Sequence, residues 1–285
     1  MATYRELLEN GKKYLKEKQI EDGNLDAWLL MEHVCGISRT WYFVHEQEEA
    51  PKEQETEYRR LFRLRGEKIP LQQLTHEAYF YGMKFYVNEH VLIPRQDTEV
   101  LVEEVLKEAK ARKGLRILDM CTGSGCILLS LLANLEESEG TGVDLSREAL
   151  KVAERNGKML GISAQWINSD LFQQISGKYD ILVSNPPYIQ TAVIEGLMEE
   201  VKCHEPRMAL DGKEDGLYFY RKITEQAGAF LNLGGLLAFE IGYDQGEAVA
   251  RLLKEQGYEE IQIIKDLAGL DRVVTGKKNQ EENHV

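Results

Sequence analysis

The segment LDMCTGSGCILLSLL, residues 118–132, reads as a buried strand, a glycine-rich turn and an apolar helix in direct succession. The strand ends near Asp119, and Gly123 and Gly125 let the backbone turn tightly and let a ligand approach it closely. The free N–H groups at the start of the helix face the same place. We therefore predict a nucleotide-binding turn here, formed by Asp119, Cys121, Thr122, Gly123, Ser124 and Gly125. The alternative is a plain tight turn without a ligand.

The turn lacks the third glycine of a dinucleotide-binding motif, because Leu128 stands three positions after Gly125. That glycine serves close helix–strand packing around a pyrophosphate. A GxG turn preceded by an aspartate instead suits a cofactor that has no pyrophosphate. A dinucleotide-dependent oxidoreductase is disfavoured for this reason, and because no acid–base residue stands near the turn.

Strands and helices alternate from residue 115 onward. We predict strands at 115–119, 139–144, 164–168, 180–184, 235–241, 258–264 and 271–276, and helices at 125–134, 146–160, 216–231 and 244–256. Such alternation is typical of a parallel sheet covered by helices on both faces. The last two strands leave no room for a crossover helix, so the last strand should run antiparallel.

Further polar residues stand where other predicted strands end. Asp144 lies 19 residues after Gly125, where a carboxylate can bind both ribose hydroxyls of a nucleoside. It could instead cap the next helix, although Ser146 can do this itself. Asp170 and Leu171 follow the third strand and could border an adenine ring. In open α/β sheets the strand ends line the ligand crevice.

The sequence SNPPYI, residues 184–189, follows the fourth strand. Pro186 and Pro187 lack backbone N–H groups, so this loop presents carbonyl oxygens and the side chain of Asn185. Two such acceptors, the Asn185 side-chain oxygen and the Pro186 carbonyl, suit the two hydrogens of an –NH2 group. Tyr188 offers a flat face against which a planar group can stack. The alternative is a strand exit with Tyr188 as core filler.

The first 75 residues carry helical patterns. Tyr4, Leu7, Leu8 and Leu15 share one face; Asn24 could cap a second helix that ends at Gly36, and Pro51 could open a third. AYFYGMKFYVNEHVLI, residues 78–93, then reads as a β-hairpin around Gly82-Met83, and a helix follows with Asp97 or Thr98 as its cap and Gly114 after its end.

The overall charge is −13, and residues 1–80 hold 12 Lys and Arg against 15 Asp and Glu. This balance disfavours non-specific nucleic-acid binding. The four cysteines show no metal-ligand spacing, so we expect reduced thiols, no metal and a cytoplasmic protein. No apolar run is long enough to span a membrane, and we expect a monomer.

Three motifs in this order, IPRQDTE (93–99), NPPY (185–188) and EPRMALDGKEDG (205–216), resemble those of the protein-glutamine methyltransferases that modify peptide chain release factors. The resemblance covers about residues 4–276. It implies a Rossmann-like class I methyltransferase that uses S-adenosylmethionine. It also implies a helical substrate-docking domain (1–75), a β-hairpin linker (76–96), a methyltransferase domain (97–278) and a disordered tail (279–285).

The resemblance implies that the methyl group goes to the side-chain amide of the glutamine in the Gly-Gly-Gln loop of a release factor. Asn185, Pro186 and Tyr188 would be catalytic, and these three with Pro187 would bind the substrate. Asn185 would also contact the cofactor. Glu205 and Arg207 would either support the NPPY loop or line the substrate channel, and His204 would be structural.

The sequence departs from the family pattern at three positions, with Cys121 for a glycine, Gln96 for a proline and Leu171 where tryptophan is frequent. Cys121 could replace glycine if its φ angle is negative. An amino-methyltransferase of DNA or RNA shares the NPPY chemistry and is the main alternative; a binding module without activity is a further one.

Overall fold

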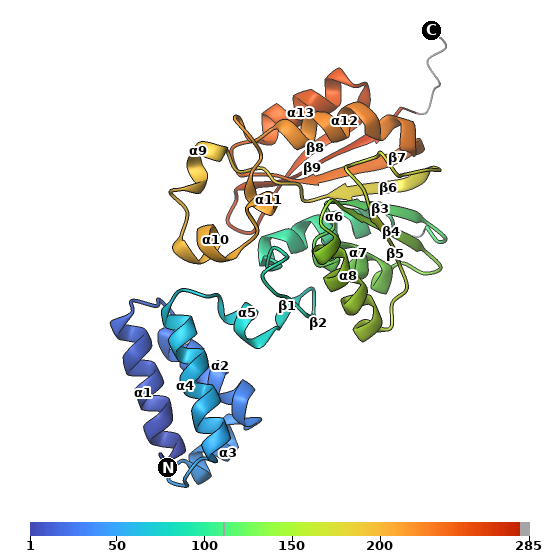
Figure 1. The fold of residues 1–285 in the computed structure, drawn as a ribbon. Coiled ribbons are helices and arrows are strands. Elements are labelled where there is room, and N and C mark those ends of the chain that lie inside the picture. Colours follow the sequence, from blue (N-terminus) through green and yellow to red (C-terminus); the bar gives the residue numbers. More distant parts are fainter. Residues whose placement is uncertain (111, 280–285) are drawn as a thin grey trace. The chain divides into compact units, whose positions relative to one another are not determined.

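A computed structural model describes residues 1–110 and 112–279 of the chain (Figure 1). The chain folds as two compact units. The helical unit comprises Met1–Glu77 together with Met198–His204, and the sheet-containing unit comprises Ala78–Leu197 and the chain from Glu205 onward. The sequence boundary at residue 75 did not foresee that a later segment belongs to the helical unit. Residues 280–285 of the predicted tail lie outside the described residues.

The helical unit contains α1 (Tyr4–Glu17), α2 (Gly23–Cys35), α3 (Arg39–His45), α4 (Lys52–Gly66), α5 (Leu71–Thr75) and α10 (Glu199–His204). Thr3 and Glu6 form a capping box at the start of α1. Tyr4, Leu7, Leu8 and Leu15 are buried on one face of α1, as their spacing predicts.

Two details of the helical prediction are wrong. Asn24 lies inside α2, whose first flanking residue is Asp22, while Gly36 ends this helix in the left-handed conformation as expected. The short helix α3 was not predicted, because its seven residues are too few to show a periodicity.

A buried ion pair joins α2 and α4 within the helical unit. Arg65 Nε donates to Asp26 Oδ2 at 2.6 Å, and its Nη2 donates to Glu200 Oε1 of α10 at 2.8 Å. Burial raises the pKa of Asp26 although Arg65 opposes this. Because the two buried partners neutralise each other, removing either leaves an uncompensated charge.

The sheet-containing unit begins with a hairpin of β1 (Ala78–Phe80) and β2 (Met83–Phe85). Its turn is Tyr81-Gly82, both with positive φ, which matches the right-handed twist of the two strands. The predicted turn was one residue later. The helix after the hairpin, α6 (Glu99–Glu108), follows a 3₁₀ turn η1 (Gln96–Thr98) and ends at Glu108, earlier than Gly114 suggested.

Seven strands form one sheet in the order β5-β4-β3-β6-β7-β9-β8. The strands are β3 (Arg116–Met120), β4 (Glu139–Asp144), β5 (Gln165–Asn168), β6 (Tyr179–Ser184), β7 (Leu231–Glu240), β8 (Tyr258–Lys265) and β9 (Asp271–Lys278). The last strand, β9, lies between β7 and β8 and is antiparallel to both. The prediction of a mostly parallel α/β sheet with an antiparallel last strand is confirmed.

Helices cover both faces of this sheet (Figure 1). Successive strand residues point to opposite faces, so Ile117 and Ile181 pack against α6 and α7 (Cys126–Asn134), while Leu118 and Leu182 pack against α12 (Tyr218–Phe230) and α13 (Gly246–Glu255). The remaining helices of the unit are α8 (Arg147–Leu160), α9 (Thr191–Ile194) and α11 (Arg207–Leu210). The first strand of this sheet along the chain is β3, in its middle; β4 and β5 extend the sheet on one side of β3, and β6 to β9 extend it on the other.

We predict that Arg65→Met destabilises the protein by about 3 kcal/mol, because Asp26 would remain buried without its partner. Arg60→Met is the matched control, since Arg60 pairs with Glu57 on the exposed face of the same helix and should cost less than about 1 kcal/mol. Urea denaturation followed by tryptophan fluorescence measures both. Equal losses would contradict the assignment.

Candidate functional site

The glycine-rich turn between β3 and α7 combines three left-handed residues. Cys121, Gly123 and Gly125 have φ angles of 62°, 54° and 78°. A β-carbon on Gly123 would meet open space, whereas one on Gly125 would lie 2.9 Å from the ring of Trp166. Gly125 therefore gives α7 its close approach to β5, and Gly123 leaves room above the backbone for a ligand.

The condition that φ at Cys121 be negative is not met. A side chain in the left-handed region carries a steric cost of about 1–2 kcal/mol that glycine avoids. The thiol lines a cavity, and burial raises its pKa far above the usual range, so it is a neutral group.

Asp119, at the end of β3, lies beneath the turn and is fully buried. Its Oδ2 accepts a hydrogen bond from Thr122 Oγ1 at 2.5 Å. Burial raises the pKa of Asp119 to about 7, and the Thr122 hydroxyl partly offsets this. Asp119 therefore supports the turn from the side away from the cavity, through its hydrogen bond with Thr122. Thr122 and Ser124 line the cavity.

Asp144, at the end of β4, bridges two loops. Its Oδ2 accepts from the Gly123 N–H at 3.0 Å and its Oδ1 from the Ser146 N–H at 2.8 Å. Ser146 caps α8 itself, through a 3.1 Å bond from Ala149 N–H to its hydroxyl. The capping alternative for Asp144 is therefore ruled out, and each carboxylate oxygen keeps a lone pair for a ligand.

Asn156 of α8 is a supporting residue that sequence reasoning missed. It is fully buried, and its side chain bonds to both the N–H and the carbonyl of Tyr86 and to the carbonyl of Ser124. It therefore ties the segment after the hairpin to the glycine-rich turn. A polar residue on the buried face of a predicted helix was the available signal.

The NPPY loop leaves the end of β6 at Asn185. Ser184 Oγ donates to the Met120 carbonyl at 2.6 Å and so fixes the end of β6 to the end of β3. Asn185 lines the cavity, and its Nδ2 donates to Thr98 Oγ1 at 3.5 Å. This contact turns the side-chain oxygen of Asn185 away from Thr98 and leaves it available as an acceptor.

Tyr188 does not line the cavity, unlike Asn185 and Pro187. Its hydroxyl donates to Glu240 Oε1 at 3.4 Å, and burial raises the pKa of this hydroxyl above its usual range. Phe219 of α12 lines the cavity and offers an aromatic ring there. The stacking role predicted for Tyr188 is therefore not apparent from its position in the structure.

The segment from Glu205 to Gly216 is bound tightly to the NPPY loop. Ile189 exchanges backbone hydrogen bonds with Leu210 and Gly212, and a β-carbon on Gly212 would lie 2.7 Å from Tyr188. Gln245, which precedes α13, donates to the carbonyls of Tyr188 at 3.0 Å and Gly216 at 3.4 Å. The loop and this segment therefore form one support.

Glu205, Arg207 and His204, whose roles the sequence left open, lie in different surroundings. The Glu205 side chain is buried and pairs with Arg95, which lines the cavity, at 2.5 Å. Arg207 is exposed and pairs with Glu195 at 3.5 Å. His204 lies in the helical unit, with Nε2 3.3 Å from the Glu67 carbonyl. These positions favour a supporting role for Glu205.

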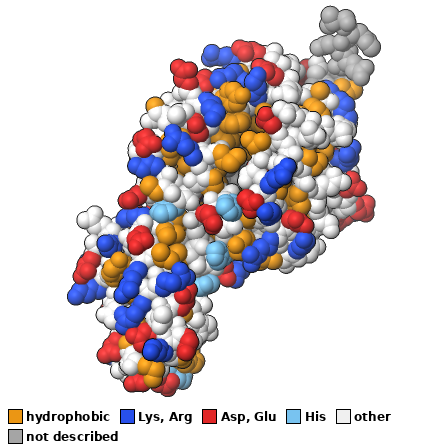
Figure 2. Space-filling model, viewed as in Figure 1, with side chains coloured by type: hydrophobic (Ala, Val, Ile, Leu, Met, Phe, Trp, Pro, Cys, Tyr) orange, Lys and Arg blue, Asp and Glu red, His pale blue; other side chains and the backbone are white. Residues whose placement is uncertain are grey.

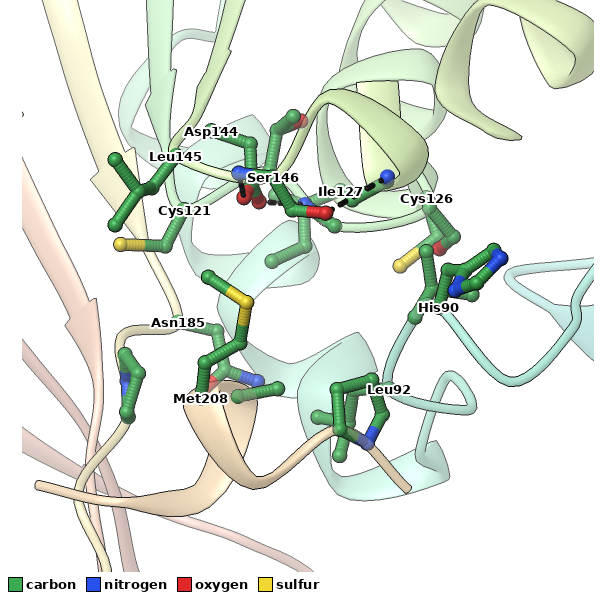
Figure 3. Close-up of a pocket in the computed structure, with 18 of the residues that line it drawn as sticks. His90, Leu92, Cys121, Cys126, Ile127, Asp144, Leu145, Ser146, Asn185 and Met208 are labelled. Atoms are coloured by element: carbon green, nitrogen blue, oxygen red, sulfur yellow. Dashed lines mark hydrogen bonds between the residues drawn. The ribbon is translucent and has the colours of Figure 1, made fainter. Parts of the chain in front are cut away.

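All these strand ends surround one cavity of about 220 Å³. Figure 3 shows Cys121 and Leu145 on one side of it, with Asn185 and Met208 facing them and His90 and Leu92 arriving from the segment after the hairpin. Asp144 and the turn residues Cys121, Thr122, Gly123 and Ser124 are among its lining residues, while Asp170 and Leu171 are not. The cavity thus has an apolar wall beside the Asp144 carboxylate, a lining that suits a nucleoside.

Known proteins resemble this chain over most of its length. Residues 6–75 match the family model of the PrmC N-terminal domain, and residues 95–204 match that of the methyltransferase small domain. The chain is 40% identical to the release factor glutamine methyltransferase of Caulobacter vibrioides, over 95% of both chains. It is 37% identical to the protein of that name from Agrobacterium fabrum, over 97% of this chain and 98% of the relative.

A crystal structure of a methyltransferase from Pyrococcus furiosus shares the fold. It matches 70% of this chain and 91% of its own, with a TM-score of 0.52 and 16% identity.

We predict that Cys121→Gly stabilises the protein by about 0.5–1 kcal/mol, because relief of the left-handed strain exceeds the added freedom of glycine in the unfolded chain. Urea denaturation measures this change. Cys126→Gly, inside helix α7, is the control and should be destabilising. A loss of stability in Cys121→Gly would show that its side-chain packing outweighs the backbone strain.

Proposed function

We propose that the cavity binds S-adenosylmethionine and that Asn185 presents the glutamine of a release factor to it. The premise is that this chain belongs to the family of release factor glutamine methyltransferases. The substrate nitrogen would be the side-chain amide of the Gly-Gly-Gln loop. The observation that carries the proposal is the position of Asn185 in the same cavity as Gly123 and Asp144.

The lining of the cavity fits this cofactor. Asp144 offers carboxylate lone pairs to ribose hydroxyls, and Leu145 and Ile127 offer apolar contact to a flat ring. The space above Gly123 allows close approach to the backbone. When bound, S-adenosylmethionine supplies an electrophilic methyl group on a positively charged sulfur.

Asn185 and Pro186 would prepare the nucleophile. An amide nitrogen reacts poorly because its lone pair is delocalised into the carbonyl group. Acceptance of its two hydrogens by Asn185 Oδ1 and the Pro186 carbonyl favours a pyramidal nitrogen and offsets the positive charge that develops there. The amide nitrogen loses a proton only after its bond to the methyl group has formed, so the reaction needs no strong base.

Tyr188 and Pro187 have supporting parts in this proposal. Pro187 lines the cavity beside Asn185 and keeps the loop rigid. Tyr188 would position the loop through its bond to Glu240, and Phe219 would offer the flat surface first assigned to Tyr188.

The alternative substrate, an exocyclic amine of DNA or RNA, is less favoured. Its chemistry would use the same two acceptors, so the loop alone does not exclude it. The net charge of −13 opposes a phosphate backbone, and Figure 2 shows acidic and basic side chains interspersed over the face that it presents. The names of the curated relatives also favour the glutamine.

The helical unit would be the docking surface for the release factor. Phe43 and Val44 of α3 expose 72% and 74% of their surface, which is unusual for adjacent apolar residues. No helix among the described residues is long and apolar enough to cross a bilayer. We propose a monomeric enzyme that acts in the cytoplasm, where release factors work.

A labelling experiment tests this function. The protein is incubated with methyl-labelled S-adenosylmethionine and, separately, with a release factor, its variant with the loop glutamine replaced by alanine, and RNA or DNA. Label in the unchanged factor alone is expected. Label in nucleic acid would overturn the proposal.

Asn185→Ala should lower kcat by about 10²–10³, because one acceptor for the developing charge is lost. Binding of S-adenosylmethionine, measured by calorimetry, should be largely kept. Asn232→Ala is the matched control, since Asn232 bonds to Asp180 at the opposite edge of the sheet. Normal turnover by Asn185→Ala would remove this residue from the mechanism.

The double variant Phe43→Ser, Val44→Ser should raise the KM for the folded release factor several-fold through lost apolar contact. The rate with a short Gly-Gly-Gln peptide should not change, because the peptide lacks the folded domains of the release factor that would contact Phe43 and Val44. An unchanged KM for the folded factor would contradict the docking assignment.

A further inference from the structure

A buried carboxyl group lies behind the NPPY loop and has no part in the mechanism above. Glu240 is the last residue of β7 and is 2% exposed. Ser184 and Phe239 are paired between β6 and β7, so Asn185 and Glu240 are the residues that follow this pair on the two strands. Glu240 is not among the residues that line the cavity, so any effect on the substrate must act through a neighbour.

The side chain of Glu240 faces two hydroxyl groups. Tyr188 donates to its Oε1 at 3.4 Å, and the Thr98 hydroxyl comes close enough to lower the pKa of the carboxyl. Its Oε2 has no partner of ordinary hydrogen-bond geometry among the described residues, so it can take up the hydrogen of Thr98. The Glu240 backbone carbonyl accepts from Tyr220 Oη at 2.9 Å, which fixes the residue.

Thr98 connects Glu240 with the catalytic loop. It is 2% exposed and stands at the start of α6, yet its side chain does not cap that helix. Its oxygen instead accepts from Asn185 Nδ2. A hydroxyl has a single hydrogen, so a Thr98 that donates to Glu240 can only accept from Asn185.

We propose that Glu240 is a positioning residue that, through Thr98, fixes the side-chain amide of Asn185 with its oxygen toward the substrate. Both hydrogen bonds are donated in the same direction: Asn185 Nδ2 donates to Thr98, and the Thr98 hydroxyl donates to the Glu240 carboxylate. If the direction reversed, Thr98 would donate to Asn185 Oδ1 and the amide nitrogen would face the substrate. The inference rests on the proposed function, because it concerns the acceptor that Asn185 supplies.

The ionised form of Glu240 does not stabilise the folded protein. Burial raises the pKa of Glu240 to about 7, against the hydroxyls of Thr98 and Tyr188 and the charge of Arg272, which lower it. A carboxyl with a raised pKa stabilises the fold below its unfolded pKa, and this contribution is lost as the pH rises through about 7. A buried ionisable group that does not stabilise the fold when it is charged is a candidate for a functional role.

This direction of hydrogen-bond donation, from Asn185 through Thr98 to Glu240, requires Glu240 to be ionised, because a protonated Glu240 can itself donate to Thr98. We therefore expect kcat to rise with pH through a midpoint near 7. The other titratable groups that act on Glu240 come from η1, the NPPY loop, α7, α12 and β9; they are Asp97, Tyr188, Cys126, Tyr220 and Arg272. The pKa values of Tyr188, Cys126, Tyr220 and Arg272 are all raised above their usual values, so none of these four groups titrates near pH 7.

The kinetic test compares isosteric variants at saturating S-adenosylmethionine. Glu240→Gln should lower kcat ten- to hundredfold, with the KM for the cofactor unchanged and the rise near pH 7 abolished. Thr98→Val should lose as much, because it keeps the shape without the hydroxyl, and Thr98→Ser should restore the rate. Glu104→Gln, a buried carboxyl that pairs with Lys107, is the control with normal kinetics.

A second measurement needs no activity. The side-chain amide resonances of Asn185, assigned by their loss in Asn185→Ala, should move with pH in the wild-type protein with a midpoint near 7. They should not move in Glu240→Gln. Resonances that titrate identically in both proteins, or normal kcat and pH profile in Glu240→Gln, would overturn the inference. Absence of glutamine methylation by the wild type would instead refute the proposed function, and the resonances would still decide this one.

Discussion

The site depends on one property of parallel sheets, that neighbouring strands end at the same edge. Because the strand order reverses between β3 and β6, the ends of these two strands border a crevice that no crossover helix fills. Asp144 and Asn185 come from strands on either side of β3, more than 40 residues apart in sequence. The Ser184–Met120 hydrogen bond holds β6 to β3 just before Asn185. The separation of Asp144 and Asn185 is therefore set by the sheet.

The turns themselves are held by side chains from outside them. Asn156 supports the glycine-rich turn and Gln245 supports the NPPY loop, each by donating to two backbone carbonyls. Loops with several glycines or prolines leave many backbone groups unpaired, and a buried amide can satisfy them at a fixed place. Both loops are thus fixed before any ligand binds, which reduces the ordering cost of binding.

Sequence patterns predicted the fold well because alternating strands and helices have only a few arrangements in space. They also placed Asp144 and Asn185 at strand ends, and the structure brings these residues to one cavity. They failed where a choice depends on contacts distant in sequence. Neither the direction of Tyr188, which Glu240 decides, nor the φ of Cys121 can be read from local residue types. Thr98 looked like a helix cap, yet its hydroxyl is used elsewhere.

Two buried carboxyl groups, Asp119 and Glu240, stand at the ends of β3 and β7, the strands on either side of β6 and its Asn185. Burial raises the pKa of both to about 7, so their ionisation opposes folding as the pH rises through that value. The Thr122 hydroxyl, on a residue that lines the cavity, donates to Asp119, and the role proposed for Glu240 assigns the same relation to Thr98. A hydroxyl has one hydrogen, so a threonine that donates to a buried carboxylate can act only as an acceptor toward the cavity. In both places the buried carboxylate would therefore leave the threonine oxygen as an acceptor on the side of the cavity.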